Sequence, residues 1–133
     1  KLNIKNDEIV LITAAKWRRH KRLKETIKFL KILNQNERKY KLIVLGENEN
    51  NESIEDVYFV GRVKLDELPY WYRAANIYIH LCWIEACGNT QIEAMACGLP
   101  VLCCNNGGIG ETVKLSNGDT SNSSLLFCFW IEL

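Results

Sequence analysis

The sequence predicts an α/β fold, a Rossmann-like doubly wound parallel sheet within a single domain. Short, continuous apolar runs rich in valine, isoleucine and leucine are typical of strands that are buried on both faces of a parallel sheet. Amphipathic helical patterns separate these runs, and strands that alternate with helices form βαβ units. A length of 133 residues with 47% hydrophobic and 25% charged residues suits one globular core.

The first strand and the first helix are expected near the N-terminus. Residues Ile9–Ile12 form a short β-branched run, which predicts a strand. From Leu23 to Leu33, apolar residues recur at intervals of three and four, with charged residues between them. This period is that of an amphipathic helix, whose apolar side would pack on the sheet.

The remaining elements are expected to follow in the same alternation. Pro69 should interrupt the second helix near its start, and Gly98-Leu99-Pro100 should end the third. Because ligands bind beyond the carboxyl ends of parallel strands, the loops that follow the strands are the candidate functional segments. The expected strands are Tyr40–Leu45, Val57–Val60, Asn76–Leu81, Val101–Cys104 and Leu125–Ile131, and the expected helices are Leu65–Ala75 and Thr90–Cys97.

Composition excludes several classes of protein. No apolar run reaches the roughly 18 to 20 residues that a bilayer span needs, and the polar N-terminus is unlike a signal peptide. The six cysteines form no Cys-x-x-Cys pair and the two histidines lie outside zinc-ligand spacing, so no metal site is expected. Most of the cysteines lie in or beside predicted strands, where cysteine packs as a small hydrophobe. We therefore expect reduced thiols and a cytoplasmic location.

Charge is distributed unevenly along the chain. Residues 1–45 carry 13 basic and 4 acidic side chains, a net of +9, whereas residues 46–133 carry 4 and 12, a net of −8. The overall net charge is only +1. A basic segment of this kind indicates an anionic partner, but two faces that neutralise each other would give the same pattern.

The first candidate loop is the basic run from Lys16 to Arg22, directly after the first strand. A helix N-terminus offers phosphate unpaired N–H groups and a positive dipole end, and lysine or arginine adds charge-assisted hydrogen bonds. Phosphate binding is therefore one interpretation of this run. An exposed basic helix face and a nucleic-acid contact are the alternatives.

The second candidate loop lies between Glu85 and Glu93, at a strand-to-helix turn. Two carboxylates there could accept hydrogen bonds from two sets of sugar hydroxyls. Glu47 and Glu55 have the same spacing, so the spacing alone carries no information. Thr90-x-x-Glu93 also matches a capping box, in which the glutamate closes onto the first N–H groups of its own helix. On the residues alone, both interpretations of Glu93 stay open.

The third candidate loop follows the expected strand Val101–Cys104 and contains Gly107, Gly108 and Gly110. Glycines let the backbone approach a ligand closely, and N–H groups that open a following helix can hold an anion. A plain turn requires glycine as well, so a structural turn is the alternative.

In combination, these segments resemble a known family. The runs Leu81–Gly88 and Ile92–Val101, followed by Gly107-Gly108-x-x-Glu111, are similar to the donor-binding signature of retaining family-4 (group 1) glycosyltransferases of the GT-B architecture. Upstream, Val57-x-Phe59-x-Gly61-x-Val63 is similar to a preceding strand of that family. The resemblance covers residues 9–113.

The resemblance implies that a sugar is transferred from a nucleotide-sugar, a UDP- or GDP-sugar, with retention of configuration and without a metal or other cofactor. Glu93 would bind the ribose hydroxyls, and Glu85 would face the donor sugar. Lys16 and Lys21 would neutralise the diphosphate leaving group in the transition state, which is a catalytic role. The further donor-binding residues that the resemblance implies are Gly88, Asn89, Thr90, Gly61, Arg62, Gly107, Gly108 and Glu111.

Two positions depart from the family pattern. Lys16 stands where the family has arginine, which keeps the charge but loses bidentate geometry, so Arg18, Arg19 or Arg22 could substitute. Leu81-Cys82 stands where the family commonly has Pro-Ser, which removes a hydroxyl near the site.

The family architecture implies that residues 1–133 form the nucleotide-sugar donor-binding domain, the C-terminal half of the fold, with its last helices missing. The acceptor-binding N-terminal domain has no counterpart in the sequence. We therefore expect a chain that binds nucleotide and transfers sugar only with that domain or a partner chain, with no nucleic-acid partner and with self-association through exposed sheet. The alternatives are a sugar-nucleotide epimerase or phosphorylase on the same scaffold, and a basic nucleic-acid-binding module.

Overall fold

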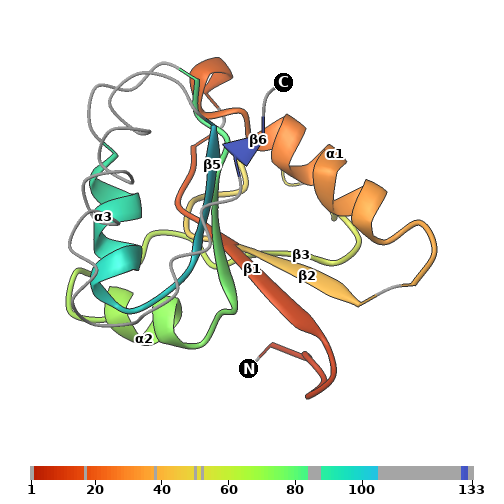
Figure 1. The fold of residues 1–133 in the computed structure, drawn as a ribbon, viewed down its shortest axis with the longest axis horizontal. Helices are drawn as coiled ribbons and strands as arrows, with labels where there is room; N and C mark the ends of the chain where they lie inside the picture. Colours follow the sequence, from red (N-terminus) through yellow and green to blue (C-terminus); the bar gives the residue numbers. More distant parts are fainter. Residues whose placement is uncertain are drawn as a thin grey trace.

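A parallel sheet forms the centre of the molecule. The computed structural model describes residues 2–16, 18–37, 39–49, 51, 53–83, 88–104 and 130–131. Within these residues, six strands form one sheet in the order β3-β2-β1-β4-β5-β6, and every neighbouring pair is parallel (Figure 1). This is the doubly wound order, which reverses between β1 and β4. The α/β, Rossmann-like prediction is confirmed.

The strands lie close to their predicted positions. Three of them end one residue earlier than expected, and the strand expected at Leu125–Ile131 is described only at its last two predicted residues. The rest of that prediction lies outside the described residues. The strands are β1 Ile9–Thr13, β2 Tyr40–Val44, β3 Val57–Phe59, β4 Ile77–His80, β5 Val101–Cys104 and β6 Trp130–Ile131.

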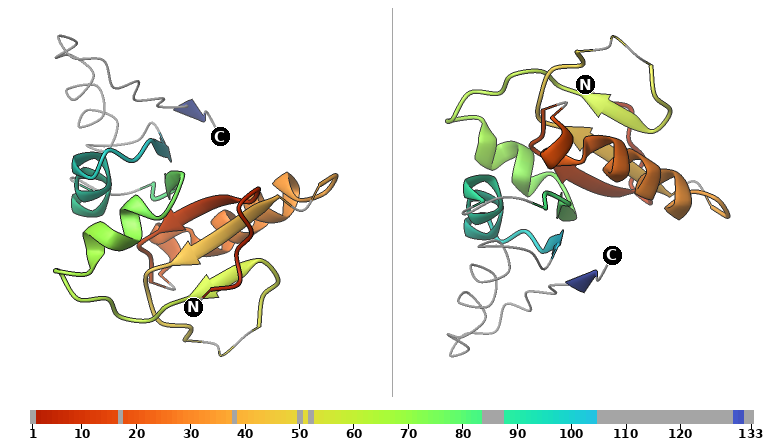
Figure 2. Two further views of the ribbon diagram at one scale, coloured as in Figure 1. Left: turned by 90° about the horizontal axis from the view of Figure 1, so that it is seen from below. Right: turned by 90° about the horizontal axis from the view of Figure 1, so that it is seen from above.

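Helices cover both faces of the sheet, as Figure 1 and the two views of Figure 2 show. Helix α1, Leu23–Leu33, packs on one face, and a short 3-10 helix, Arg19–Lys21, leads into it. On the opposite face lie α2, Leu68–Arg73, and α3, Asn89–Ala96. This two-sided cover explains why the central strands read as continuous apolar runs: both faces of β1, β4 and β5 are buried.

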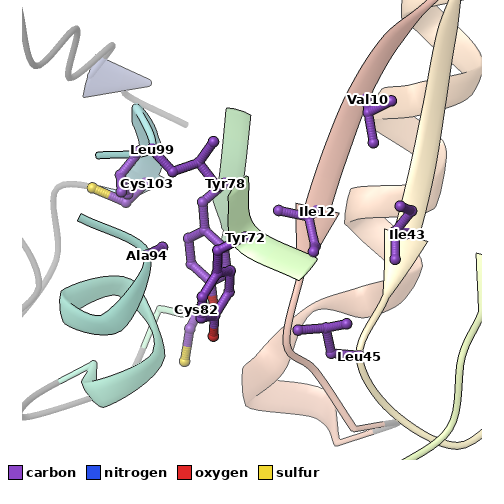
Figure 3. Close-up of a cluster of buried hydrophobic side chains, with 11 residues drawn as sticks. Val10, Ile12, Ile43, Leu45, Tyr72, Tyr78, Cys82, Ala94, Leu99 and Cys103 are labelled. Atoms are coloured by element: carbon purple, nitrogen blue, oxygen red, sulfur yellow. The ribbon is translucent and has the colours of Figure 1, made fainter. Parts of the chain in front are cut away.

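Alternate residues of each strand supply two hydrophobic cores. On β1, Val10 and Ile12 pack in the core beneath α2 and α3, whereas Leu11 packs in the core beneath α1. Figure 3 shows the first of these cores, where Tyr72 and Tyr78 lie between the strands and α3. Successive side chains of a strand point to opposite faces, so the sheet alone keeps the two cores apart.

Helix α2 differs from the prediction. It begins at Leu68 rather than Leu65, and residues 65–67 form a turn. Pro69 therefore occupies the first turn of the helix, where a missing N–H costs no intrahelical hydrogen bond and the fixed φ suits the helix. The proline starts this helix instead of interrupting it.

A cluster of charged side chains ties together the amino ends of three neighbouring strands, at the edge of the sheet opposite the candidate loops. The Nζ atom of Lys41, on β2, lies 3.2 Å from Oε1 of Glu8, which precedes β1, and 2.6 Å from Oδ1 of Asp56, which precedes β3. Asn34 also donates a hydrogen bond to Asp56 Oδ2 at 3.1 Å. The Lys41 side chain is only 12% exposed, so solvent screens these pairs weakly.

Replacing Lys41 with methionine is expected to flatten the dependence of stability on pH at the alkaline end of the range, and in part at the acid end. The Lys5 backbone N–H, which the variant keeps, and secondarily Lys41 lower the pKa of Glu8 below 4.5. The share of this stability that comes from Lys41 is lost as pH falls below that value, and is absent from the variant. Asp56, and secondarily Glu8, raise the pKa of Lys41 above 10.5, so this contribution is lost as pH rises past that value. Urea denaturation at a series of pH values measures the free energy of unfolding in both pH ranges.

The matched control is Lys39→Met, which removes a lysine whose pair with Glu37 is wide and exposed, 3.7 Å apart with side chains 43% and 76% exposed. This control should keep the unmodified pH profile. A Lys41→Met chain whose profile also matched the unmodified one would contradict the prediction.

Candidate functional site

A cavity of about 620 Å³ opens at the carboxyl ends of β1, β2 and β3. Its walls are the loops that follow these strands, together with side chains from α2 and α3. The cavity lies where doubly wound sheets bind ligands, beyond the carboxyl edge and beside the reversal of strand order. Six of the predicted site residues line it: Lys16, Lys21, Gly61, Arg62, Thr90 and Glu93.

The other predicted site residues do not line this cavity or lie outside the described residues. Gly88 is buried and caps the N-terminus of α3, and Asn89, the first residue of that helix, is exposed. Both immediately precede Thr90 in the chain but are not among the residues that line the cavity. The predicted roles of Glu85, Gly107, Gly108 and Glu111 stay predictions, because these four residues lie outside the described part of the chain.

Backbone hydrogen bonds continue past the strand ends and hold the three loops together. The N–H of Leu45 donates to the carbonyl of Thr13 at 2.8 Å, and the N–H of Gly61 donates to the carbonyl of Gly46 at 3.2 Å. A Cβ atom at Gly46 would lie 2.4 Å from the carbonyl oxygen of Ala15. Only glycine permits this approach, so Gly46 sets the spacing between two walls of the cavity.

Replacing Gly46 with alanine is expected to lower the free energy of unfolding by about 1 to 3 kcal/mol, the usual cost of overpacking. The added methyl group would press on the Ala15 backbone, which is part of the β1 loop and cannot turn aside as a side chain would. Urea denaturation measures the change. Ala74→Ser, which adds one atom at an exposed position, serves as the control and should change stability little. Equal stability for the two variants would contradict this prediction.

Basic and acidic side chains lie on different sides of the cavity. Its β1 side carries Lys16, Arg18 and Lys21, and its β2 side carries Glu47 and Glu49. Lysine and arginine bind phosphate through charge-assisted hydrogen bonds, whereas carboxylates accept hydrogen bonds from hydroxyl groups. A ligand with an anionic part and a polyhydroxyl part therefore matches this arrangement.

The contacts of Thr90 and Glu93 show that the capping-box interpretation is wrong. Helix α3 begins at Asn89 with Gly88 as its N-cap, and no side chain caps it. Thr90 is therefore inside the helix, and its hydroxyl oxygen accepts a hydrogen bond of 2.7 Å from the hydroxyl of Tyr78. The Glu93 carboxylate accepts a hydrogen bond of 3.2 Å from the hydroxyl of Tyr72. Both side chains face the cavity instead of the N-terminus of their own helix.

Sequence reasoning missed several residues of the site. Gly46, Glu47 and Glu49 line the cavity from the loop after β2, and their only sequence signal is a glycine directly after a buried strand. His20 lines it from the 3-10 helix, and its carbonyl accepts a hydrogen bond of 3.4 Å from the Trp83 N–H. That bond ties the loop after β1 to the segment after β4, on the two sides of the reversal of strand order.

Three further observations concern metal-binding groups, cysteines and membrane-spanning helices. Among the described residues, no group of three or more His, Cys, Asp or Glu side chains is placed to hold a metal ion. None of the cysteines that the structure describes, Cys82, Cys97, Cys103 and Cys104, forms a disulfide. None of the described helices has the length and apolar character that crossing a bilayer demands.

Comparison with known proteins identifies relatives of this chain. The family model of glycosyl transferases group 1 matches residues 1–120. Over 57 residues the chain is 37% identical to the O-antigen chain mannosyltransferase B of Escherichia coli, covering 43% of this chain and 15% of that protein. The structure of WaaG, a glycosyltransferase involved in lipopolysaccharide biosynthesis, superposes with a TM-score of 0.72 at 24% identity, covering 86% of this chain and 33% of WaaG.

A further solved structure holds a ligand. HepE of Anabaena, in complex with UDP-glucose, superposes with a TM-score of 0.67 at 21% identity, covering 79% of this chain and 32% of HepE. The two structural likenesses agree with the predicted fold. This chain spans a third or less of the length of all three proteins.

Proposed function

Because this chain belongs to the glycosyl transferases group 1 family, we propose that it binds the nucleotide-sugar donor of a retaining, family-4 glycosyl transfer. One observation carries the proposal: Lys16, Lys21 and Glu93, from segments far apart in the sequence, line the same cavity. A nucleoside diphosphate presents two phosphates and a pair of ribose hydroxyls. Cations suit the phosphates and a carboxylate suits the hydroxyls.

In this proposal Glu93 accepts hydrogen bonds from the ribose hydroxyls. Its carboxylate lies on the cavity wall and is held by the Tyr72 hydroxyl. The nucleotide base would lie against Gly61 and Arg62, in the loop after β3. Gly61 has a φ of +74°, a conformation that glycine adopts without strain. Apart from its chain neighbours, no atom lies within 4 Å of the place that a Cβ atom would occupy, which leaves room for a flat ring beside its backbone.

Lys16 and Lys21 serve the chemical step. When the glycosidic bond to the donor breaks, negative charge builds up on the departing diphosphate, and cations held in place beforehand stabilise that charge. Lys21 belongs to the 3-10 helix and Lys16 to the loop before it, so both approach the cavity from the β1 side. Glu85 is proposed to face the donor sugar on the strength of the family resemblance alone.

We further propose that this chain supplies the donor-binding, C-terminal half of a GT-B enzyme, and that the acceptor-binding half comes from an N-terminal domain or a partner chain. The small share of each relative that the chain covers supports this division. Under this proposal the chain alone transfers no sugar to a supplied acceptor. Detectable transfer by the chain alone would contradict the division.

A thermal-unfolding screen with UDP, GDP, ADP and their sugar conjugates tests donor binding. A ligand present at about 100 times its dissociation constant adds about 2.7 kcal/mol of stability. For a domain of this size, the melting temperature should rise by several degrees. Uridine, guanosine and adenosine without phosphates are the controls and should give much smaller shifts. A folded chain whose melting temperature responded to none of the diphosphates would contradict the proposal.

A further inference from the structure

We propose that Tyr72 and Tyr78 act as a positioning pair, which fixes the ligand-facing side chains of α3 before the nucleotide arrives. The inference deepens the proposed function and rests on it, because it takes Glu93 to be the ligand of the ribose. Neither tyrosine was predicted to be a site residue, although Tyr72 is among the residues that line the cavity.

The two tyrosines come from different elements and meet inside the core (Figure 3). Tyr72 lies on α2 and Tyr78 on β4, and their side chains are 1% and 0% exposed. Their rings meet edge to face, with centroids 5.8 Å apart and planes at 81°. This is a favoured aromatic geometry, so each ring limits the movement of the other.

Each hydroxyl reaches a different residue of α3. The Tyr72 hydroxyl donates to Glu93 Oε2 at 3.2 Å, and the Tyr78 hydroxyl donates to Thr90 Oγ1 at 2.7 Å. Thr90 and Glu93 are three residues apart, so they lie on the same face of the helix, and both line the cavity. The pair therefore holds two neighbouring points on one wall of the site.

The proton that Tyr72 donates favours a fixed orientation of the Glu93 carboxylate. Burial, and then the proximity of Tyr78 and Glu93, raise the pKa of Tyr72 far above its usual range, so its phenol keeps the proton that it donates. A glutamate side chain that is free to rotate would lose conformational entropy when it bound a ligand. Holding it in advance removes part of that cost, which is preorganisation of the site.

A second contact links the pair to the last residue of β4. The ring of His80, also on β4, stacks on Tyr78 with centroids 5.9 Å apart and planes at 20°. Its Nδ1 atom lies 3.4 Å from the Tyr78 hydroxyl. Tyr78 is thus held from two sides, by Tyr72 and by His80, which makes it a rigid anchor for Thr90.

The variant Tyr72→Phe tests the inference, because phenylalanine keeps the ring contact with Tyr78 and removes only the hydroxyl. The probes are UDP, GDP and ADP, each with its 2′,3′-dideoxy analogue, and the measurement is affinity by calorimetric titration. We expect Tyr72→Phe to weaken binding of the ribonucleotide about 3- to 10-fold, the usual cost of ordering one flexible side chain on binding. Binding of the dideoxy analogue, which offers Glu93 no hydroxyl, should be unchanged.

Two further variants complete the test. Tyr58→Phe removes a hydroxyl that donates to the Asn3 carbonyl at 3.4 Å, and Tyr58 is not among the residues that line the cavity, so both affinities should keep their unmodified values. In a Glu93→Ala background, Tyr72→Phe should have no further effect on ribonucleotide affinity. A coupled pair is expected to behave in this non-additive way.

The outcomes separate this inference from the proposed function. If Glu93→Ala weakens ribonucleotide binding but Tyr72→Phe does not, the positioning role is wrong and the proposed function stands. Equal losses for the ribonucleotide and its dideoxy analogue in Tyr72→Phe would mean a structural role only, and would also overturn the inference. An unmodified chain that binds none of UDP, GDP and ADP would overturn both.

Discussion

The variant Glu93→Ala is expected to abolish the stabilisation of this chain by nucleoside diphosphates. Hydrogen bonds to a charged group contribute about 1.5 to 3 kcal/mol each, and the carboxylate is proposed to accept one from each of two ribose hydroxyls. Their loss would weaken binding by roughly 10²- to 10⁴-fold. Calorimetric titration of the nucleotide that binds the unmodified chain measures the change.

Two matched variants test whether the loss of affinity is specific to the Glu93 carboxylate. Glu37→Ala makes the same change at an exposed glutamate outside the cavity, and should leave the affinity unaltered. Glu93→Gln keeps the shape of the side chain but removes its charge, so its affinity should fall between those of the alanine variant and the unmodified chain. Nucleotide binding by Glu93→Ala at the unmodified affinity would refute the role proposed for this residue.

The double variant Lys16→Ala with Lys21→Ala is expected to cause the second large loss of nucleotide affinity. It removes the contribution that the phosphates make to binding. Each lysine is proposed to make a charge-assisted contact with the diphosphate, so the pair contributes about 3 to 6 kcal/mol. The variant should bind the nucleoside diphosphate no better than the unmodified chain binds the nucleoside alone. Its affinity should also depend less on salt concentration.

A second double variant separates this site from a basic surface in general. Lys24→Ala with Lys28→Ala removes the same charge from the exposed side of α1, and neither residue lines the cavity. Because the two variants change the net charge equally, a long-range effect of charge would weaken binding equally in both. Equal losses would therefore favour a solvated basic face. Loss in the Lys16 and Lys21 variant alone would favour a diphosphate site.

The sheet was predictable from the sequence because its central strands are buried on both faces. Strands such as Ile9–Thr13 and Val101–Cys104 read as unbroken apolar runs, and in a doubly wound sheet such runs have few other structural solutions. The convergence of Lys16 and Glu93 was predictable for a related reason. Both follow strands whose carboxyl ends lie at one edge of a parallel sheet.

The contacts that shape the cavity were not predictable, because they join residues that are distant in the sequence. Gly46 must be glycine because the carbonyl of Ala15 lies too close for a Cβ atom, and no local sequence pattern predicts that contact. Likewise, the Tyr72 hydroxyl finds its partner 21 residues away on another helix. Local patterns describe the faces of single elements, whereas these contacts depend on how the elements pack.

The capping-box prediction for Glu93 failed for a local reason. Thr90 and Glu93 have the spacing of the motif, but the helix starts one residue before Thr90, so the threonine cannot serve as the N-cap. Two buried tyrosines then offer hydroxyl donors to the threonine and the glutamate. The cap geometry, with Gly88 as the N-cap and no side-chain cap, excludes the capping box, whereas the ribose-binding role of Glu93 stays a proposal.

The most direct test of the central claim is an NMR titration of the ¹⁵N-labelled chain with the nucleoside diphosphate that binds it. The account predicts chemical-shift changes at the backbone amides of Lys16, Gly61 and Glu93, which lie on three walls of one cavity. The amides of Lys31, in the last turn of α1, and of Lys41, near the amino end of β2, should stay unchanged. Shift changes confined to α1, or spread evenly over the basic N-terminal segment, would contradict the account.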